Sequence, residues 1–339
     1  LGDGHVEQDA EAFWWGGFLR VVNCLLKKAD IDSSQIAGIA VSGFFPNLCP
    51  VNGLGKPLRP AILYSDNRAS DEVVNLNEDF GLQETTEEVL PKLLWLKHHE
   101  PEVFEQTHMI FNPSNYVVYR LTGVYGIDYL SAYGFGALYD EQQGTWDKKI
   151  CKALSVSPGS LPELFTSTAV VGGVSTEASQ VTGLCQGTPV VMGTADSYAT
   201  MLGATVLEPG DCLISYGTTG LGVLLNDDMA MLLSKRPVGL QKKMSTFTYL
   251  LSLGSSLEWF KAQFCNEEGA IASGSSGLSR MLDEEAEGIS AGAEGLVVLP
   301  YLLGLRVPVW EPRARGLIYG LTTKHNKYHI WRAMLEAFG

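Results

Sequence analysis

Apolar residues recur at helical spacing in several stretches of the chain. The first is residues 11–28, which carries Phe13, Trp14, Leu19, Val22, Leu25 and Leu26 and ends with Lys27 and Lys28. This spacing predicts an amphipathic helix, and cations at its end favour the helix C-terminus. The same reasoning predicts helices over residues 87–99, 112–121, 176–182, 197–202, 255–264 and 328–338.

Short apolar runs bounded by glycine and other turn residues predict strands. Residues 36–42 and 188–192 are expected to be buried strands, each followed closely by a glycine. Further strands are predicted over 60–64, 211–216, 221–225 and 247–253, and the stretch 295–303 is again apolar. Residues 126–138 are expected to be loop or strand, and residues 273–276 to be a loop.

The order of these elements predicts two domains. A length of 339 residues suits about two domains, and a second series of strands and turns begins near Gly187. We therefore expect one domain over residues 1–186 and another over residues 187–339. Apolar residues make up 45% of the chain and charged residues 18%, which is enough apolar material for a core in each domain.

Charge and cysteine usage narrow the function. A net charge of −14 repels nucleic-acid backbones, so no nucleic-acid partner is expected, whereas a local loop of N–H groups can still hold a phosphorylated nucleotide. The six cysteines are scattered without a CxxC pair, and we expect them to be reduced, mostly buried and part of a cytoplasmic protein. No apolar run is long enough to span a membrane.

Asp196 is the main candidate for chemistry. The predicted strand 188–192 runs through Gly193, Thr194 and Ala195 to this carboxylate, where a helix is predicted to begin. The carboxylate could be a helix N-cap, which stabilises a helix by about 1 kcal/mol. It could also be a general base, because open α/β sheets place ligands at the carboxyl ends of their strands. The pattern alone leaves both readings open.

A second candidate is the segment Tyr216-Gly217-Thr218-Thr219-Gly220, which lies between two predicted strands. It could be an ordinary hairpin turn, in which the two threonines are incidental. It could also be a phosphate-binding hairpin, because glycine lets the backbone approach a polyphosphate and threonine hydroxyls donate further hydrogen bonds.

Two other strand ends carry candidate ligand-binding residues. Phe45 follows the predicted strand 36–42, and Tyr64, Asp66 and Arg68 follow the strand 60–64. Neighbouring strand ends would place these residues over one crevice. Asp66 and Arg68 could bind hydroxyl groups, while Phe45 or Tyr64 could pack against a sugar face. The alternative is a surface salt bridge with two core aromatic residues.

Taken together, these segments resemble the FGGY carbohydrate kinases, which include xylulose, glycerol, gluconate and ribulose kinases. The resemblance rests on four groups of residues spread over nearly the whole chain. They are His5-Val-Glu-Gln-Asp9 with Trp14-Trp15; residues 190–203 with Glu208-Pro-Gly-Asp211; residues 216–220; and Leu299-Pro-Tyr-Leu302, Arg306, Pro308, Pro312, Ala314-Arg-Gly316, Gly320-Leu-Thr322 and His325. Pro91-Lys-Leu-Leu-Trp95 with His99-Glu-Pro101 is similar to xylulose kinases.

The resemblance implies an α/β, two-domain actin-like or ribonuclease H-like fold with a cleft between the domains. The first domain would bind the sugar and the second would bind ATP with Mg²⁺. Asp196 would be the base and would also contact the sugar. Phe45, Tyr64 and Asp66 would contact the sugar as well; Gly217, Thr218, Thr219 and Gly220 would bind the ATP phosphates, and Gly254 would lie beside the nucleotide.

The resemblance also implies a substrate and its rivals. The expected acceptor is a ketopentose such as xylulose; the alternatives are another polyol or sugar acid (glycerol, gluconate or ribulose), or a sugar-binding relative without catalysis. Xylulose kinases carry Gln-Met-His and glycerol kinases Gln-Arg-Glu where this chain has Phe44-Phe45-Pro46, and Leu305 stands where many members have Glu. A homodimer is left open as the assembly, and no membrane partner is expected.

Two parts of the family pattern lie outside this sequence. They are the opening D-x-G-T-(T/S) strand and hairpin, and the glycine-rich adenine-binding segment expected after Gly339. The first holds a phosphate loop and a carboxylate for magnesium. The first domain is thus expected to lack its first strands and the second to lack its end, and we expect little kinase activity from residues 1–339 alone.

Overall fold

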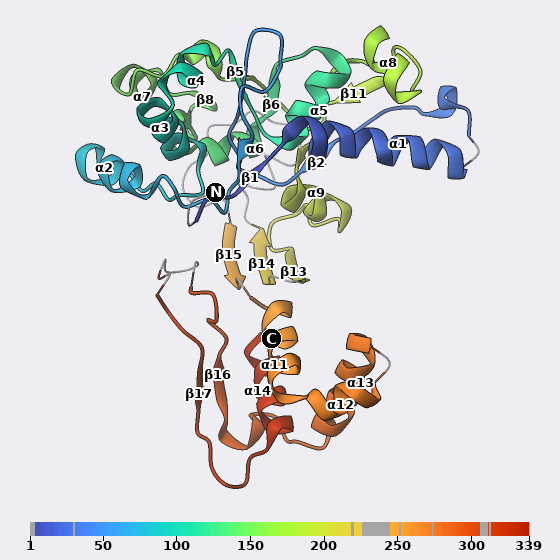
Figure 1. Cartoon of the computed structure of the whole chain (residues 1–339), viewed down its shortest axis with the longest axis vertical. Coiled ribbons are helices and arrows are strands. Elements are labelled where there is room, and N and C mark those ends of the chain that lie inside the picture. Colours follow the sequence, from blue (N-terminus) through green and yellow to red (C-terminus); the bar gives the residue numbers. More distant parts are fainter. Residues whose placement is uncertain are drawn as a thin grey trace. The chain divides into compact units, whose positions relative to one another are not determined.

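The computed structural model describes residues 4–29, 31–217, 220–225, 245–250, 252–272, 274–305, 311 and 313–338. The described residues form two compact units, one up to Leu207 and one from Glu208 onward (Figure 1). The division therefore falls after Leu207, whereas the sequence predicted a boundary after residue 186. The reason is that the strands and the helix that follow residue 186 pack within the first unit.

The first unit contains mostly short elements. Its helices are the π-helix Ala10–Trp15, α1 (Gly16–Ala29), α2 (Ser70–Phe80), α3 (Val89–His99), α4 (Pro101–Gln106), α5 (Pro113–Thr122), α6 (Tyr129–Ala132), α7 (Lys148–Ala153), α8 (Thr176–Thr182) and α9 (Asp196–Gly203), with 3₁₀ turns at Ser33–Gln35, Tyr133–Leu138 and Pro158–Ser160. Its strands are β1 (Glu7–Gln8), β2 (Ser42–Gly43), β3 (Cys49–Val51), β4 (Ala61–Ile62), β5 (Met109–Phe111), β6 (Gly126–Asp128), β7 (Tyr139–Asp140), β8 (Thr145–Trp146), β9 (Glu163–Phe165), β10 (Val170–Gly173), β11 (Pro189–Val191) and β12 (Thr194–Ala195).

Two strand pairs in the first unit are parallel. β12 pairs with β2, and β6 pairs with β9. The other pairs, β1 with β4, β3 with β5, β7 with β8 and β10 with β11, are antiparallel. Two apolar clusters hold these pairs together. One includes Leu90 and Leu93 of α3 together with Phe135, and the other includes Trp14, Tyr116 and Val190 around α5. The second cluster packs β11 against α5, which fixes the direction from which β12 arrives.

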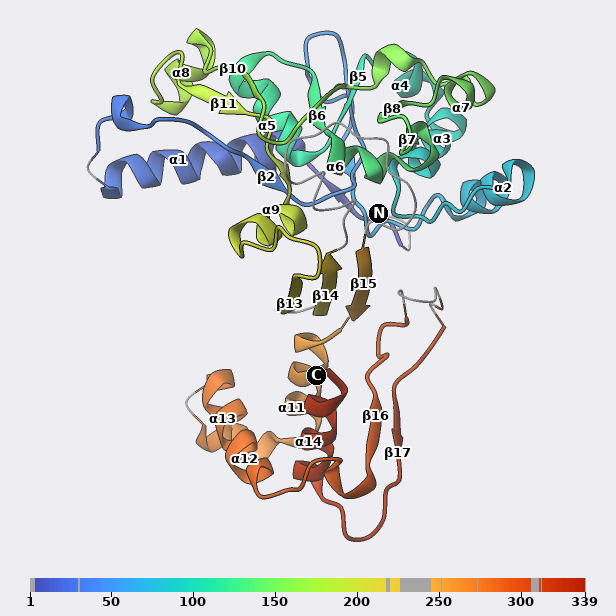
Figure 2. The ribbon, with the colours of Figure 1, turned by 180° about the vertical axis from the view of Figure 1, so that it is seen from behind.

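The second unit is built from a three-stranded meander, a hairpin and helices. β13 (Cys212–Tyr216), β14 (Gly220–Leu225) and β15 (Ser245–Leu250) pair antiparallel in that order, as do β16 (Val297–Leu299) and β17 (Leu317–Tyr319). The helices are α11 (Gly254–Phe264), α12 (Asn266–Ile271), α13 (Gly274–Glu287) and α14 (Lys327–Phe338), with a 3₁₀ turn at Ala293–Gly295. α11 and α14 lie side by side (Figure 2), with the rings of Phe260 and Trp331 5.6 Å apart at their centroids.

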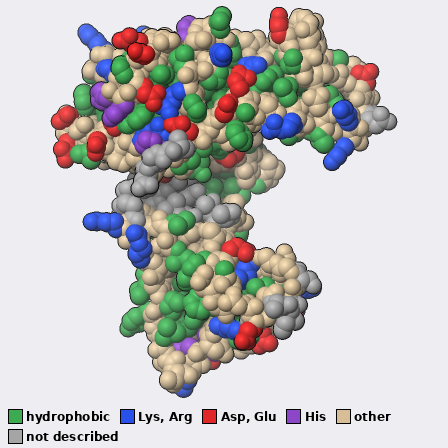
Figure 3. Space-filling model, viewed as in Figure 1, with side chains coloured by type: hydrophobic (Ala, Val, Ile, Leu, Met, Phe, Trp, Pro, Cys, Tyr) green, Lys and Arg blue, Asp and Glu red, His purple; other side chains and the backbone are tan. Residues whose placement is uncertain are grey.

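Apolar side chains also gather on the surface of the second unit. They follow β16, β17 and the residues just beyond them (Figure 3). Val297, Leu299, Leu303, Leu317, Tyr319 and Leu321 are all exposed there.

The predicted helices are confirmed, with small shifts at their ends, and so are the strands over 188–192, 211–216, 221–225 and 247–253. Three predictions are wrong. Residues 36–42 are not a buried strand: Ala37, Gly38 and Ala40 are exposed, and a two-residue strand begins at Ser42. The loop predicted at 273–276 is already the first turn of α13 from Gly274 onward. The stretch 126–138 begins as a strand but continues as short helices.

The cysteines are less buried than predicted. Cys49, Cys151 and Cys265 are buried, Cys185 is half-buried, and Cys24 and Cys212 are exposed. In the described part of the chain, no helix combines the length and the apolarity that crossing a lipid bilayer requires.

Candidate active site

The site candidate Asp196 is delivered by a parallel strand pair. Thr194 lies opposite Ser42 and Ala195 opposite Gly43. A few residues earlier in both segments, a parallel bridge joins Ile39 to Val190. Both strands thus run in the same direction and end together, and the end of β2 lies beside α9 (Figure 1). This is the geometry in which α/β sheets present side chains to a ligand.

Asp196 is the first residue of α9 and its side chain is exposed. The cap of this helix is Ala195, which contributes no side-chain hydrogen bond, so the N-cap alternative is wrong. The Asp196 Oδ1 atom accepts a hydrogen bond from the Ser197 N–H at 2.7 Å. The carboxylate therefore reaches solvent at the carboxyl end of a parallel strand and at the start of a helix. In that position it can accept a proton from a bound hydroxyl.

Aromatic rings gather at the same strand ends. The Phe45 ring lies 5.6 Å from the ring of Tyr198, which is the third residue of α9 and is buried. Phe44 contacts Tyr64 and Trp14 edge-on, with 6.3 Å between the centroids in each pair. Phe45 and Tyr64 are both half-buried, so neither is the fully buried core aromatic of the alternative prediction. The structure thus brings Phe45, Tyr64 and Asp196 to one end of the β2–β12 pair.

Asp66 lies deeper than its neighbours. It is fully buried, and its oxygens accept hydrogen bonds from the Arg68 side chain at 2.8 and 2.7 Å, from the Arg68 N–H at 2.9 Å and from the Val6 N–H at 2.5 Å. Burial acts to raise the pKa of Asp66, but the bonds from Arg68 and Val6 and the charge of Arg68 hold it below its ordinary value. The salt bridge of the alternative prediction is therefore present, but it is buried and not on the surface.

Arg68, the partner of Asp66, has two further contacts. The Arg68 guanidinium also contacts the Glu7 carboxylate at 2.7 Å and lies over the Trp95 ring, 4.8 Å from its centroid. This arrangement ties the segment after β4 to β1 and α3. Both carboxylate oxygens of Asp66 already accept hydrogen bonds from the protein. Contact between Asp66 and a sugar therefore stays a prediction.

A second carboxylate near the site was not found in the sequence. Asp128 ends β6 and is 2% exposed, and its Oδ2 accepts a hydrogen bond from the Thr194 hydroxyl at 2.7 Å. Burial raises the pKa of Asp128 to about 6, against hydrogen bonds from Ser131 and Thr194 that lower it. The only sequence signal was an acid closing the short apolar run Gly126-Ile-Asp128, which a loop explains equally well.

The two predicted nucleotide segments meet in the second unit. Tyr216 pairs with Gly220, which closes the hairpin between β13 and β14. The Gly254 N–H, at the start of α11, donates to the Gly217 carbonyl oxygen at 3.0 Å. Thr218, Thr219, Arg306, Pro308 and Pro312 lie outside the described residues. Glycine-rich turns and helix N-termini are backbone features that bind phosphate in other proteins, and phosphate binding by Gly217, Gly220 and Gly254 stays a prediction.

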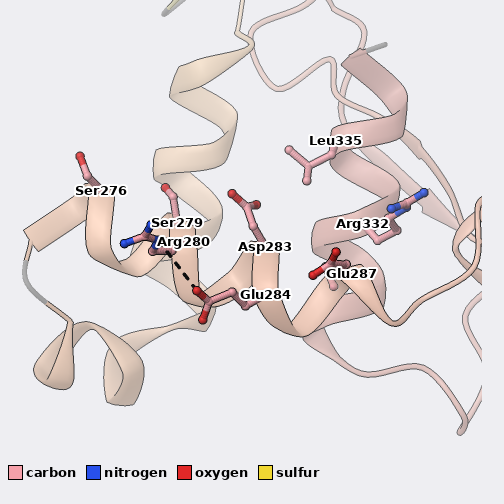
Figure 4. A pocket seen from close by; sticks show the side chains of 9 residues that line it. Ser276, Ser279, Arg280, Asp283, Glu284, Glu287, Arg332 and Leu335 are labelled. Carbon is pink, nitrogen blue, oxygen red and sulfur yellow. Dashed lines mark ion pairs between the residues drawn. The ribbon is translucent and has the colours of Figure 1, made fainter.

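The second unit also has a surface cavity of about 830 Å³ between α13 and α14 (Figure 4). Arg280, Asp283, Glu284, Glu287 and Arg332 line it, and Arg280 faces Glu284 at 3.9 Å. The side chain of Asp283 is engaged by the Trp331 indole N–H at 2.8 Å. None of the predicted site residues lines this cavity.

Comparison with known proteins gives consistent matches along the chain. Residues 2–203 match the N-terminal domain of the FGGY family of carbohydrate kinases, and residues 212–339 match its C-terminal domain. The xylulose kinase of Bacillus subtilis is 32% identical over 98% of this chain and 67% of its own length. The gluconokinase of the same organism is 25% identical over 89% of this chain and 61% of its own length.

The fold is similar to solved structures as well. The crystal structure of xylulose kinase from Rhodospirillum rubrum matches with a TM-score of 0.85 and 29% identity, over 99% of this chain and 69% of that one. The chain thus spans about two thirds of the length of the proteins it matches.

Proposed function

This chain belongs to the FGGY family of carbohydrate kinases, and from that membership we propose that it takes part in ATP-dependent phosphorylation of a sugar hydroxyl. A ketopentose such as xylulose is the proposed acceptor, because the xylulose kinase of Bacillus subtilis is similar over nearly the whole chain. The observation that carries the proposal is the β2–β12 strand pair, which ends in the exposed carboxylate of Asp196.

In the proposed reaction, the acceptor hydroxyl attacks the γ-phosphorus of ATP in line and the bond to ADP breaks. Asp196 accepts the hydroxyl proton as the new phosphorus–oxygen bond forms. Phe45 packs against Tyr198, two residues after Asp196, and Tyr64 packs against Phe44. Both rings would pack against the sugar, since aromatic rings present apolar faces to ligands. The hairpin at Gly217 and the start of α11 at Gly254 would contact the phosphates and the nucleotide.

Mg²⁺ is part of the proposal, because phosphoryl transfer needs the phosphate charge to be screened. No group of three acidic, histidine or cysteine side chains suited to a metal occurs among the described residues. Mg²⁺ usually keeps several waters and binds through one or two carboxylates and the substrate phosphates, so it does not require such a group. We therefore name no protein ligand for it and assign it no step.

Two alternatives have a specific observation behind them. Gluconate is a candidate acceptor because a gluconokinase is among the similar proteins. A sugar-binding role without catalysis is the second, because the half-buried rings of Phe44 and Phe45 could pack against a sugar without taking part in proton transfer. We also propose that the protein acts in the cytoplasm, which suits cysteines that form no disulfide. A homodimer is the oligomeric state that we propose to test.

The test is ADP release by the full-length protein with a panel of ketopentoses, polyols and sugar acids. We expect one ketopentose to raise ADP release far above the rate without acceptor. If a sugar acid is the strongest acceptor, the ketopentose assignment is wrong. If no acceptor raises ADP release while a sugar still binds, the protein is a binding relative and catalysis is excluded.

A further inference from the structure

Asp128 touches the strand that delivers the proposed base. Its Oδ2 accepts the Thr194 hydroxyl at 2.7 Å, and Thr194 is two residues before Asp196. Both side chains are buried, at 2% and 4% exposure, so this hydrogen bond is shielded from water. We propose that Asp128 is a positioning residue for Asp196, acting through Thr194. The inference rests on the proposed function, in which Asp196 is the base.

The charge of Asp128 also acts on a residue of α9. Tyr198, two residues after Asp196, is buried, and its pKa is raised by burial and then by the charges of Asp128 and Glu141. Asp128 thus bonds directly to Thr194 and acts on Tyr198 through its charge. The neighbouring strand holds the same junction from another direction, because the Thr194 N–H donates to the Val41 carbonyl oxygen at 3.3 Å.

Stability alone does not explain a carboxylate at this position. Taking a charge out of water is unfavourable, and Asp128 has no cationic partner among the groups that shift its pKa. An uncharged side chain could fill the same space without that penalty. Unfavourable charges persist where they serve a site, so the carboxylate fits a role in holding the β12–α9 junction.

The position of a base matters for rate. A displacement of about 1 Å at the reacting groups can cost on the order of 100-fold in turnover. Loss of the Thr194–Asp128 bond would release the Thr194 side chain and let the start of α9 shift. The acceptor sugar would still be held by its other contacts, so the effect would fall on kcat more than on KM.

The experiment compares Thr194→Val, Thr194→Ser, Asp128→Ala and the double variant Asp128→Ala/Thr194→Val in the full-length protein. Valine keeps the shape of threonine without the hydroxyl, and serine keeps the hydroxyl. We expect Thr194→Val to lower kcat about 10- to 100-fold with KM changed less than about threefold, and Thr194→Ser to stay within about threefold of wild type. The double variant should lose at most about threefold more than Asp128→Ala.

Three outcomes would overturn the inference: wild-type kcat in Thr194→Val, a loss that appears in KM alone, or additive losses in the double variant. Near-ultraviolet circular dichroism and the melting temperature check that each variant is folded. If Asp128→Ala does not fold, the comparison of Thr194→Val with Thr194→Ser decides. A wild-type protein that releases no ADP with any acceptor would instead refute the proposed function.

Discussion

The carbonyl oxygen of Val41 occupies the place where a side chain on residue 193 would begin: a Cβ atom added to Gly193 would lie 1.9 Å from it. Gly193 has a φ of +71°, which residues with side chains rarely adopt. Glycine therefore meets two requirements at once, a left-handed backbone and a close approach to Val41, the residue before β2. Both occur immediately before the strand that leads to Asp196.

This relationship predicts that Gly193→Ala destabilises the first unit and removes activity. Gly187→Ala is the matched control, because Gly187 has a φ of +83° with nothing within 4 Å of an added Cβ. The control should lose about 1–2 kcal/mol from backbone strain alone. Gly193→Ala should lose clearly more, because the Val41 backbone must also move. Urea unfolding of both variants measures the difference, and equal losses would show that the contact with Val41 is unimportant.

Asp196→Asn should remove most turnover and leave sugar binding detectable. The amide keeps the size of the carboxylate but cannot accept the hydroxyl proton, and general-base catalysis contributes about 100- to 10,000-fold. Glu177→Gln is the control, because Glu177 is an exposed acid in the first turn of another helix, α8. ADP release and sugar binding by calorimetry measure the two effects. Turnover near wild type in Asp196→Asn would refute its assignment as the base.

Asp66→Asn distinguishes a structural role from a sugar contact. Removing the charge leaves the Arg68 guanidinium, 2% exposed, with Glu7 as its remaining carboxylate partner, and breaking a buried pair costs about 3–5 kcal/mol. We expect a clear fall in the melting temperature, and none for Glu311→Gln, which removes one partner of an exposed pair. An unchanged melting temperature with a higher KM for the acceptor would instead favour direct contact with the sugar.

Glu84 predicts a pH dependence of stability. Burial raises its pKa to about 7; the Ala137 N–H, which donates to Oε1 at 2.7 Å, lowers it, and the charge of Glu88 raises it. Between pH 4.5 and 7, the folded protein therefore holds a proton that the unfolded chain has lost, so stability falls as the pH rises through this window.

Glu84→Gln should weaken that dependence, since a glutamine can still accept the Ala137 N–H but does not titrate. The melting temperatures of both proteins at pH 5 and pH 8 provide the comparison. We expect the melting temperature to change less favourably from pH 5 to pH 8 in the wild type than in Glu84→Gln. An equal change in the two proteins would contradict this prediction.

The elements that the sequence predicted well are those whose signals are local. α8 begins at Thr176 and ends at Thr182 as predicted, because Gly183 terminates it in a left-handed conformation. The strands β13 and β14 were found because glycines punctuate their apolar runs. By contrast, residues 36–42 have the composition of a buried strand, and whether such a strand is covered depends on the other elements of the fold.

The site was predictable to the same extent. The place of Asp196 between a strand and a helix was predicted correctly, because a strand, a glycine and a helix lie in succession around it, and its role as the base stays a prediction. Asp128 was not predicted, because its relation to Thr194 depends on two strands that come together only in the folded unit. The salt bridge between Asp66 and Arg68 was offered as an alternative, but its burial and the hydrogen bond from the Val6 backbone were not predictable, because they depend on distant segments coming together.

The parallel pairing of β2 with β12 has a consequence for how the protein is made. Ser42 and Thr194 stand near opposite ends of the first unit's sequence, so almost the whole unit must leave the ribosome before they can pair. Contacts of such high sequence separation form slowly, because a long loop must close before they form. The carboxylate of Asp196 is therefore presented only once synthesis of the unit is nearly complete, and a nascent chain that stalls earlier carries no assembled site.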